Sequence, residues 1–147
     1  MSDKERLLAV MNEEAEAVEK LLDIMMKKQK AIIALENDDL QTSINEELKI
    51  VSLTKILEKQ RLELLQRIIP ENNHPSKITI SQLASNFEGE ESEKLLSLRQ
   101  RLMKSLEHMK ELNETNRLLL ERGKNFVKEN ISILTSRGEK KLVNRKV

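Results

Sequence analysis

The sequence predicts an all-α fold: an elongated antiparallel bundle of three long, coiled-coil-like helices, with a short helix in the connection before the last one. Three observations predict it. Aromatic residues make up 1% of the 147 residues and charged residues 35%, which is typical of long helices that each bury a narrow stripe. Two prolines and three glycines allow few turns. Apolar residues also recur at steps of three and four along most of the chain.

The first helix is predicted over residues 3–36. Its apolar stripe comprises Leu8, Met11, Ala15, Val18, Leu22, Met25, Gln29 and Ile32, and is widened by Leu7, Leu21, Ile24 and Ile33. A stripe this wide is suited to packing against more than one helix. The acidic segment "ENDD" is predicted to end the helix, with Asn37 or Asp38 capping the next one and Gln41 at capping-box spacing from Asp38. A tight hairpin and a kinked rod both fit this break, and the hairpin is preferred.

The second helix is predicted to end before Pro70. Its seam comprises Leu40, Ile44, Leu48, Val51, Leu53, Leu57, Gln60, Leu64 and Ile68, with a shift near residues 51–53. The segment "PENNHPSK" then predicts a loop. After it, Thr79 and Gln82 are spaced for a capping box, flanked by Ile78 and Leu83, so a helix of one or two turns is expected there.

The last helix is predicted from about residue 90 to Ser136, with Gly123 as its one internal breaker. It exceeds the first two helices by about four turns, so roughly 20 Å of it is expected to have no partner within the chain. Its seam comprises Leu95, Leu98, Leu102, Leu106, Met109, Asn113, Asn116, Leu120, Gly123, Val127, Asn130 and Leu134.

From residue 113 onward, amides and a glycine interrupt this seam, and a second line of Leu119, Phe126 and Ile133 runs beside it. One interpretation is that the asparagines fix the register of a packed helix. The other is that this stretch binds a partner helix, with apolar anchors, a glycine that permits close approach and amides that select register. The candidate binding residues are Asn113, Asn116, Leu119, Leu120, Gly123, Phe126, Val127, Ile131 and Leu134.

The residue types predict neither an enzyme nor a cofactor or metal site. The two histidines, His74 and His108, have no second histidine at metal-ligand spacing. A group of Glu107, His108 and Glu111 on one helical surface is interpreted as a solvated charged face. There is no cysteine, no signal-peptide pattern at the start and no apolar run near the ~20 residues of a membrane span, so a cytoplasmic protein without membrane insertion is expected.

We expect one helical domain over residues 1–136 and a basic, flexible tail over residues 137–147. The tail carries five Lys or Arg against one Glu, in a chain of net charge +1. Nucleic-acid binding through the tail is a rival interpretation, but no aromatic stacking groups accompany these charges, so no nucleic-acid partner is predicted. A structural coiled-coil homodimer or adaptor, closed through residues 113–134, is the main alternative to partner binding.

The pattern resembles the FlgN family of flagellar export chaperones over about residues 5–135. The pieces that carry the resemblance are the acidic break before Leu40, "EKQR" with Arg61, the linker "ITISQLA" and the spacing Asn113-x-x-Asn116-x-x-Leu119. The resemblance implies a non-enzymatic cytoplasmic chaperone. Its clients would be the hook-filament junction proteins FlgK and FlgL, bound through their C-terminal helical segments and delivered unpolymerised to the export gate protein FlhA.

In such families the C-terminal amphipathic helix contacts the client, which maps onto Asn113, Asn116, Leu119, Leu120, Phe126 and Val127. A tyrosine near the C-terminus helps some relatives to dock on the gate. This chain has no tyrosine, which leaves Phe126 as the candidate substitute.

Overall fold

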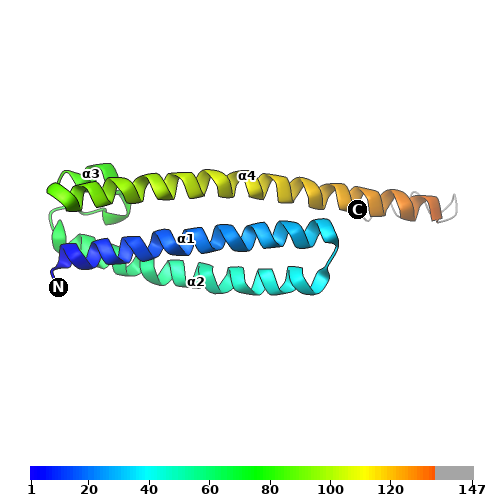
Figure 1. Ribbon diagram of the computed structural model, residues 1–147, viewed down its shortest axis with the longest axis horizontal. Helices are drawn as coiled ribbons and strands as arrows, with labels where there is room; N and C mark the ends of the chain where they lie inside the picture. Colours follow the sequence, from blue (N-terminus) through cyan, green and yellow to red (C-terminus); the bar gives the residue numbers. More distant parts are fainter. Residues whose placement is uncertain (135–147) are drawn as a thin grey trace.

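The computed structural model confirms the predicted all-α bundle (Figure 1). It describes residues 1–134, with the backbone helix alone given for residue 120 and residues 122–134. The elements are α1 (Asp3–Ala34), α2 (Asn37–Ile68), the short 3-10 helix η1 (Pro75–Lys77), α3 (Ile80–Ala84) and α4 (Gly89–Leu134).

Helix α1 is the central element of the bundle. It forms an antiparallel hairpin with α2 and lies beside α4, which runs in the same direction (Figure 1). In the described part of the chain, no Cα atom of α2 lies within 8 Å of a Cα atom of α4. The three long helices therefore form an open bundle, in which α1 joins two helices that do not pack closely on each other.

Two sides of α1 carry these contacts, as the width of its apolar stripe predicted. Toward α2, Glu14 Oε2 accepts from Arg61 Nε at 3.1 Å, and Lys28 Nζ lies 3.2 Å from Glu47. Toward α4, Asn12 Oδ1 accepts from Arg101 at 3.0 Å. The buried apolar residues of α1 are Leu7, Met11, Ala15, Ala17, Ile24, Met25 and Ala31. The prediction was wrong for Ile33, which is 64% exposed.

The largest apolar cluster lies where the N-terminal ends of α1 and α4 meet the C-terminal end of α2. The connection between α2 and α4 closes this end of the bundle. The cluster comprises Leu7, Met11, Ala15, Leu64, Leu65, Leu83, Ala84, Phe87, Leu95 and Leu98. The predicted capping box is present, since Thr79 Oγ1 accepts from the Gln82 N–H at 3.1 Å and Gln82 Oε1 from the Thr79 N–H at 3.0 Å. It starts α3 at the point that inserts Leu83, 2% exposed, into the cluster.

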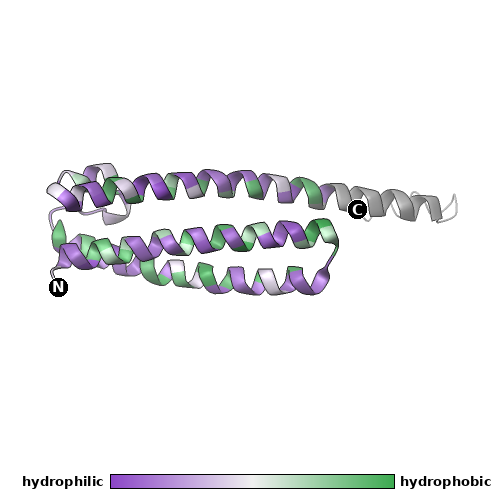
Figure 2. Ribbon diagram, in the orientation of Figure 1, coloured by the Kyte–Doolittle hydropathy of each residue, from purple (hydrophilic) through white to green (hydrophobic). Residues whose placement is uncertain are grey.

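The seam of α2 runs without the predicted shift. It follows one unbroken heptad repeat, which includes Ser43, Glu47, Ile50, Thr54, Leu57, Arg61, Leu64 and Ile68. Leu48 and Leu53, which the apolar pattern placed in the seam, are 62% and 40% exposed. The prediction failed because Glu47 and Arg61 occupy seam positions through ion pairs with α1, so polarity did not mark the outer face. In Figure 2, apolar and polar residues accordingly alternate along both helices.

The turn between α1 and α2 confirms the hairpin but corrects its caps. Helix α1 ends at Ala34, Leu35 adopts a left-handed conformation with φ 57°, and Glu36 is the N-cap of α2 without a side-chain capping bond. Asn37 and Asp38 therefore do not cap α2. The turn is so short that both residues already lie in the first turn of the helix, where acidic side chains interact favourably with the helix dipole.

Helix α4 starts at Gly89, close to the predicted residue 90, and the φ of +58° at this position suits glycine. Glu90 and Glu91 lie in its first turn, where acidic side chains interact favourably with the helix dipole. It has 46 residues against 32 in α1. Because both helices start at the same end of the bundle, α4 is longer by roughly 20 Å and continues past the hairpin turn (Figure 1). The predicted end at Ser136 and the predicted tail over 137–147 lie outside the described residues.

The strained turn residue generates a first prediction. Because a left-handed conformation costs a non-glycine residue about 1 kcal/mol, Leu35→Gly should raise the free energy of unfolding by about 0.5–1 kcal/mol in urea denaturation. The matched control, Ala34→Gly, places glycine one residue earlier within the helix and should lower it by about 1 kcal/mol. Equal destabilisation by both substitutions would contradict the turn geometry.

The Glu14–Arg61 contact generates a second prediction. Burial raises the pKa of the Glu14 carboxyl above its ordinary value of 4.5, the Arg61 guanidinium opposes this rise, and Glu58 adds to it. A raised carboxyl pKa means that the folded state binds more protons, so this group lowers stability as the pH rises from 4.5 through the raised pKa.

Glu14→Gln should remove this dependence while still accepting a hydrogen bond from Arg61. The stability of the variant minus that of the wild type should therefore increase with pH across this interval, measured by urea unfolding between pH 4 and 7. A difference that decreases with pH would show that the ion pair dominates over burial.

Candidate functional site

The α1-facing side of α4 follows a strict heptad repeat. Its positions are Leu95, Leu98, Leu102, Ser105, Met109, Leu112, Asn116 and Leu119. The prediction departed from this line after Leu102. Leu106 was placed in the seam but is 53% exposed, whereas Ser105 is 7% exposed. The helix register, rather than the most apolar residue nearby, selects the buried position, because a heptad repeat keeps one stripe facing a neighbour along its length.

The structure separates the two asparagines of the predicted site. Asn116 lies in the seam and is 5% exposed, and its Oδ1 has no hydrogen-bond partner among the described residues. Asn113 is exposed on the flank that also carries Leu106, and Leu119 is half-buried in the seam. Asn116 is therefore buried within the bundle, whereas Asn113 is accessible to a partner.

The side chains of the other candidate residues lie outside the part that the structure describes. These are Leu120, Gly123, Phe126, Val127, Ile131 and Leu134, all within the backbone range of α4. In the sequence, Leu120, Val127 and Leu134 continue the line of Leu106 and Asn113 in steps of seven. Gly123 and Phe126 continue the line of Asn116 and Leu119 in the same way. The candidate residues therefore fall mainly on two neighbouring lines of one helix.

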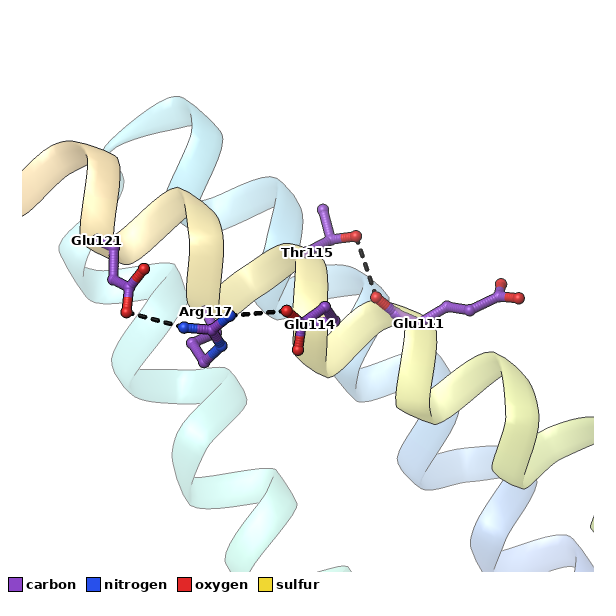
Figure 3. Close-up of polar contacts among 5 residues, drawn as sticks. All are labelled: Glu111, Glu114, Thr115, Arg117 and Glu121. Carbon is purple, nitrogen blue, oxygen red and sulfur yellow. Dashed lines mark hydrogen bonds and ion pairs between the residues drawn. The ribbon is translucent and has the colours of Figure 1, made fainter.

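Beside these lines, α4 carries charges that are paired within the helix (Figure 3). Arg117 donates to Glu114 at 2.7 Å and to Glu121 at 2.8 Å, and the Thr115 hydroxyl donates to the Glu111 carbonyl at 3.0 Å. The hydrogen bond from Arg117 and its charge lower the pKa of the Glu114 carboxyl. Pairs at these spacings stabilise a helix. They support the helical backbone of α4 at the level of the candidate residues.

Sequence reasoning missed one feature of this region, which is the row of exposed apolar residues beside the seam. Leu96, Met103 and Leu106 are 46%, 54% and 53% exposed on α4. In the sequence, each of these residues directly follows a position of the strict heptad repeat, and this placement could have predicted their exposure. Among the described residues, no group of three or more acidic or histidine side chains is placed to hold a metal ion. Within the same range, no helix is long and apolar enough to span a membrane.

Amphipathic helices with exposed apolar flanks can bind a helix of another chain by packing apolar faces together. The sequence model of the FlgN protein family matches residues 1–144, and the chain belongs to this family. The FlgN family is a family of flagellar export chaperones. The resemblance stated from the sequence is thereby confirmed. No curated protein and no solved structure matches the chain.

The contrast between the two asparagines generates a third prediction. Since Asn116 is buried with an unsatisfied carbonyl oxygen, Asn116→Leu should raise the free energy of unfolding by about 1 kcal/mol. The exposed control, Asn113→Leu, should change it by less than about 0.5 kcal/mol. Thermal and urea unfolding measure both variants. Destabilisation by Asn116→Leu would show that its amide makes a bond that stabilises the bundle.

Proposed function

We propose that this protein is a cytoplasmic export chaperone that binds the C-terminal helical segments of the hook-filament junction proteins FlgK and FlgL. It keeps them unpolymerised and delivers them to the type III export gate protein FlhA. The observation that carries the proposal is membership of the FlgN family over residues 1–144. The long helix α4, with its exposed apolar flank, supports it.

The mechanism is burial of an amphipathic client segment on helices of the chaperone. Met103 and Leu106 are more than half exposed, and Asn113 continues their flank toward the C-terminal part of α4. A client segment that folds on binding pays an ordering entropy, so apolar burial has to exceed that cost. An affinity on the order of micromolar to nanomolar would hold the client and still permit release at the gate.

Client polymerisation is blocked in this mechanism by competition for the same apolar residues. A helical segment whose stripe is buried on the chaperone cannot bury it against another subunit. At the gate, we propose that Phe126 takes the place of the tyrosine that some relatives use, because it is the aromatic residue nearest the C-terminus. A structural homodimer is the competing function, and it would use the same flank between two copies.

The fourth prediction tests client binding by calorimetric titration with the C-terminal segments of FlgK and FlgL from the same organism. We expect 1:1 binding by the wild type. The double variant Leu120→Asp, Val127→Asp should lose binding while keeping its helicity in circular dichroism, because charged side chains on a binding flank oppose apolar burial without unfolding the bundle.

Light scattering without client provides the control for the competing function. A monomer at low micromolar concentration is expected. A stable dimer, together with no heat from either segment, would replace the chaperone by the structural homodimer. A loss of helicity in the double variant would show that these positions belong to the core of the fold.

A further inference from the structure

Helices α2 and α4 pack on α1 but not on each other, so one side of α1 lies between them, and we call this the inner side. A cavity of about 240 Å³ lies on this side and is lined by all three long helices. Its lining includes Val18 of α1, Thr54 and Leu65 of α2 and Leu102 of α4. Two other cavities mark the outer sides. Ser97 of α4 lines one of them and Glu63 of α2 lines the other, each together with residues of α1.

The connection between α2 and α4 fills the inner side at one end only. Ile78, Ile80 and Leu83 line the inner cavity there, next to the apolar cluster. Toward the hairpin turn, the described elements place no segment between α2 and α4, which stay more than 8 Å apart at their Cα atoms. The segment of α1 from Val18 to Ala34, which runs along this open side, is about 25 Å long, and we call the open side the groove.

The walls of the open groove are apolar. On α2, Val51 and Ile44 lie two and three heptads before the inner residue Leu65, and Leu48 lies between them at 62% exposure. On α4, Leu106 lies one turn after Leu102 and is 53% exposed. Leu48 and Leu106 therefore lie on the flanks of α2 and α4 that border the groove.

Helix α1 lies at the bottom of the groove, where Val18 is half-buried and Met25, at 4% exposure, is already covered by its neighbours. Apolar residues thus occur on all three helices around the groove, together with the Glu14–Arg61 pair that lines the inner cavity. A fourth helix laid in the groove would contact α2 and α4 and complete a four-helix bundle.

The charges on the rim indicate the occupant. Heptad steps place Arg99 and Lys110 on the α4 wall, beside Leu106 and Met103, and Lys55 with Glu58 on the α2 wall. In the described part of the chain, none of these three cations is in an ion pair. A predominantly basic rim favours a segment with acidic side chains beside its apolar stripe.

The same charges disfavour two other occupants. The chain's own residues 137–147 carry five Lys or Arg against one Glu. A second copy would bring the α4 wall, with Arg99 and Lys110, against a like wall. Like charges brought together across an interface reduce affinity.

We propose that the groove between α2 and α4 binds an amphipathic helix of the client, with acidic residues flanking its apolar stripe, as the fourth helix of the bundle. This inference rests on the proposed chaperone function and assigns α2 to the binding site. The site continues along α4, because Leu106, Asn113, Leu120, Val127 and Leu134 form one line of seven-residue steps. The client helix thus packs against α1, α2 and α4 in the groove and against α4 beyond the hairpin turn.

The test compares inner with outer substitutions by calorimetric titration with the FlgK and FlgL C-terminal segments. Leu48→Asp and Leu106→Asp place a charge on the inner walls. Ile56→Asp and Leu118→Asp are the matched outer controls, at 57% and 40% exposure, because Ile56 lies one heptad before Glu63 and Leu118 three heptads after Ser97. The inner variants should weaken binding by about tenfold or more and the outer ones by less than about twofold.

A labelling experiment follows the same contrast without relying on affinity. The chain has no cysteine, so single cysteines at position 48 or 56 can be labelled selectively with a maleimide. Client binding should slow labelling of Leu48→Cys and leave that of Ile56→Cys unchanged. Arg99→Glu with Lys110→Glu should weaken binding and reduce its salt dependence.

The outcomes are distinguishable. Client binding that survives all inner variants would overturn the groove proposal and leave the chaperone function intact, whereas no binding by the wild type would overturn the function. A dimer that Leu48→Asp dissociates would assign the groove to a second copy. Tighter client binding after deletion of residues 137–147 would assign it to the chain's own tail. Either result would overturn the proposal.

Discussion

The simultaneous packing of α1 against two helices is the constraint on which the rest of the structure depends. A helix with one apolar stripe can serve one neighbour, whereas α1 buries apolar residues on two sides and directs polar contacts to both. Glu14 and Lys28 reach α2, and Asn12 reaches α4. Since α2 and α4 meet only α1 over most of their length, the bundle stays open on one side. Its apolar cluster is accordingly concentrated at the end that the connection closes.

This arrangement gives α4 two different environments. Its α1-facing line is buried through Leu95 and Leu98 and still buried at Asn116, while the neighbouring flank is exposed at Met103 and Leu106. A helix held along one line can present its flank to another chain without losing its own support. The same flank continues by heptad steps into the part of α4 that exceeds α1 in length, so the groove and the C-terminal candidate residues form one surface in the proposed mechanism.

The number of long helices, the hairpin, the capping box of α3 and the start of α4 could all be predicted from the sequence. These features depend on local chemistry, such as breakers, capping side chains and the period of apolar residues. The seams were predicted less well. Leu48 and Leu106 were placed inside because they are leucines, although the heptad register buries Ser43 and Ser105.

The reason is that a polar residue can occupy a seam when its partner lies on another helix. The Arg61–Glu14 pair is invisible to a pattern that scores each helix alone. Where polar residues occupy the seam, the neighbouring leucines are exposed, and these leucines form the candidate docking walls. The errors of the sequence prediction therefore coincide with the residues of functional interest. The side chains of Leu120, Phe126 and Val127 lie outside the described part, and their roles remain predictions.

The central claim is that a client helix enters the groove between α2 and α4. The most direct measurement is methyl NMR of the protein labelled at its six methionines, titrated with a client segment. Met103 lies on a groove wall and Met25 at the bottom of the groove, whereas Met1 lines the cavities on the outer sides. We expect contacts between the client and the Met103 methyl, a shifted Met25 signal and an unchanged Met1 signal. Saturable binding that leaves Met103 and Met25 unchanged would contradict the claim.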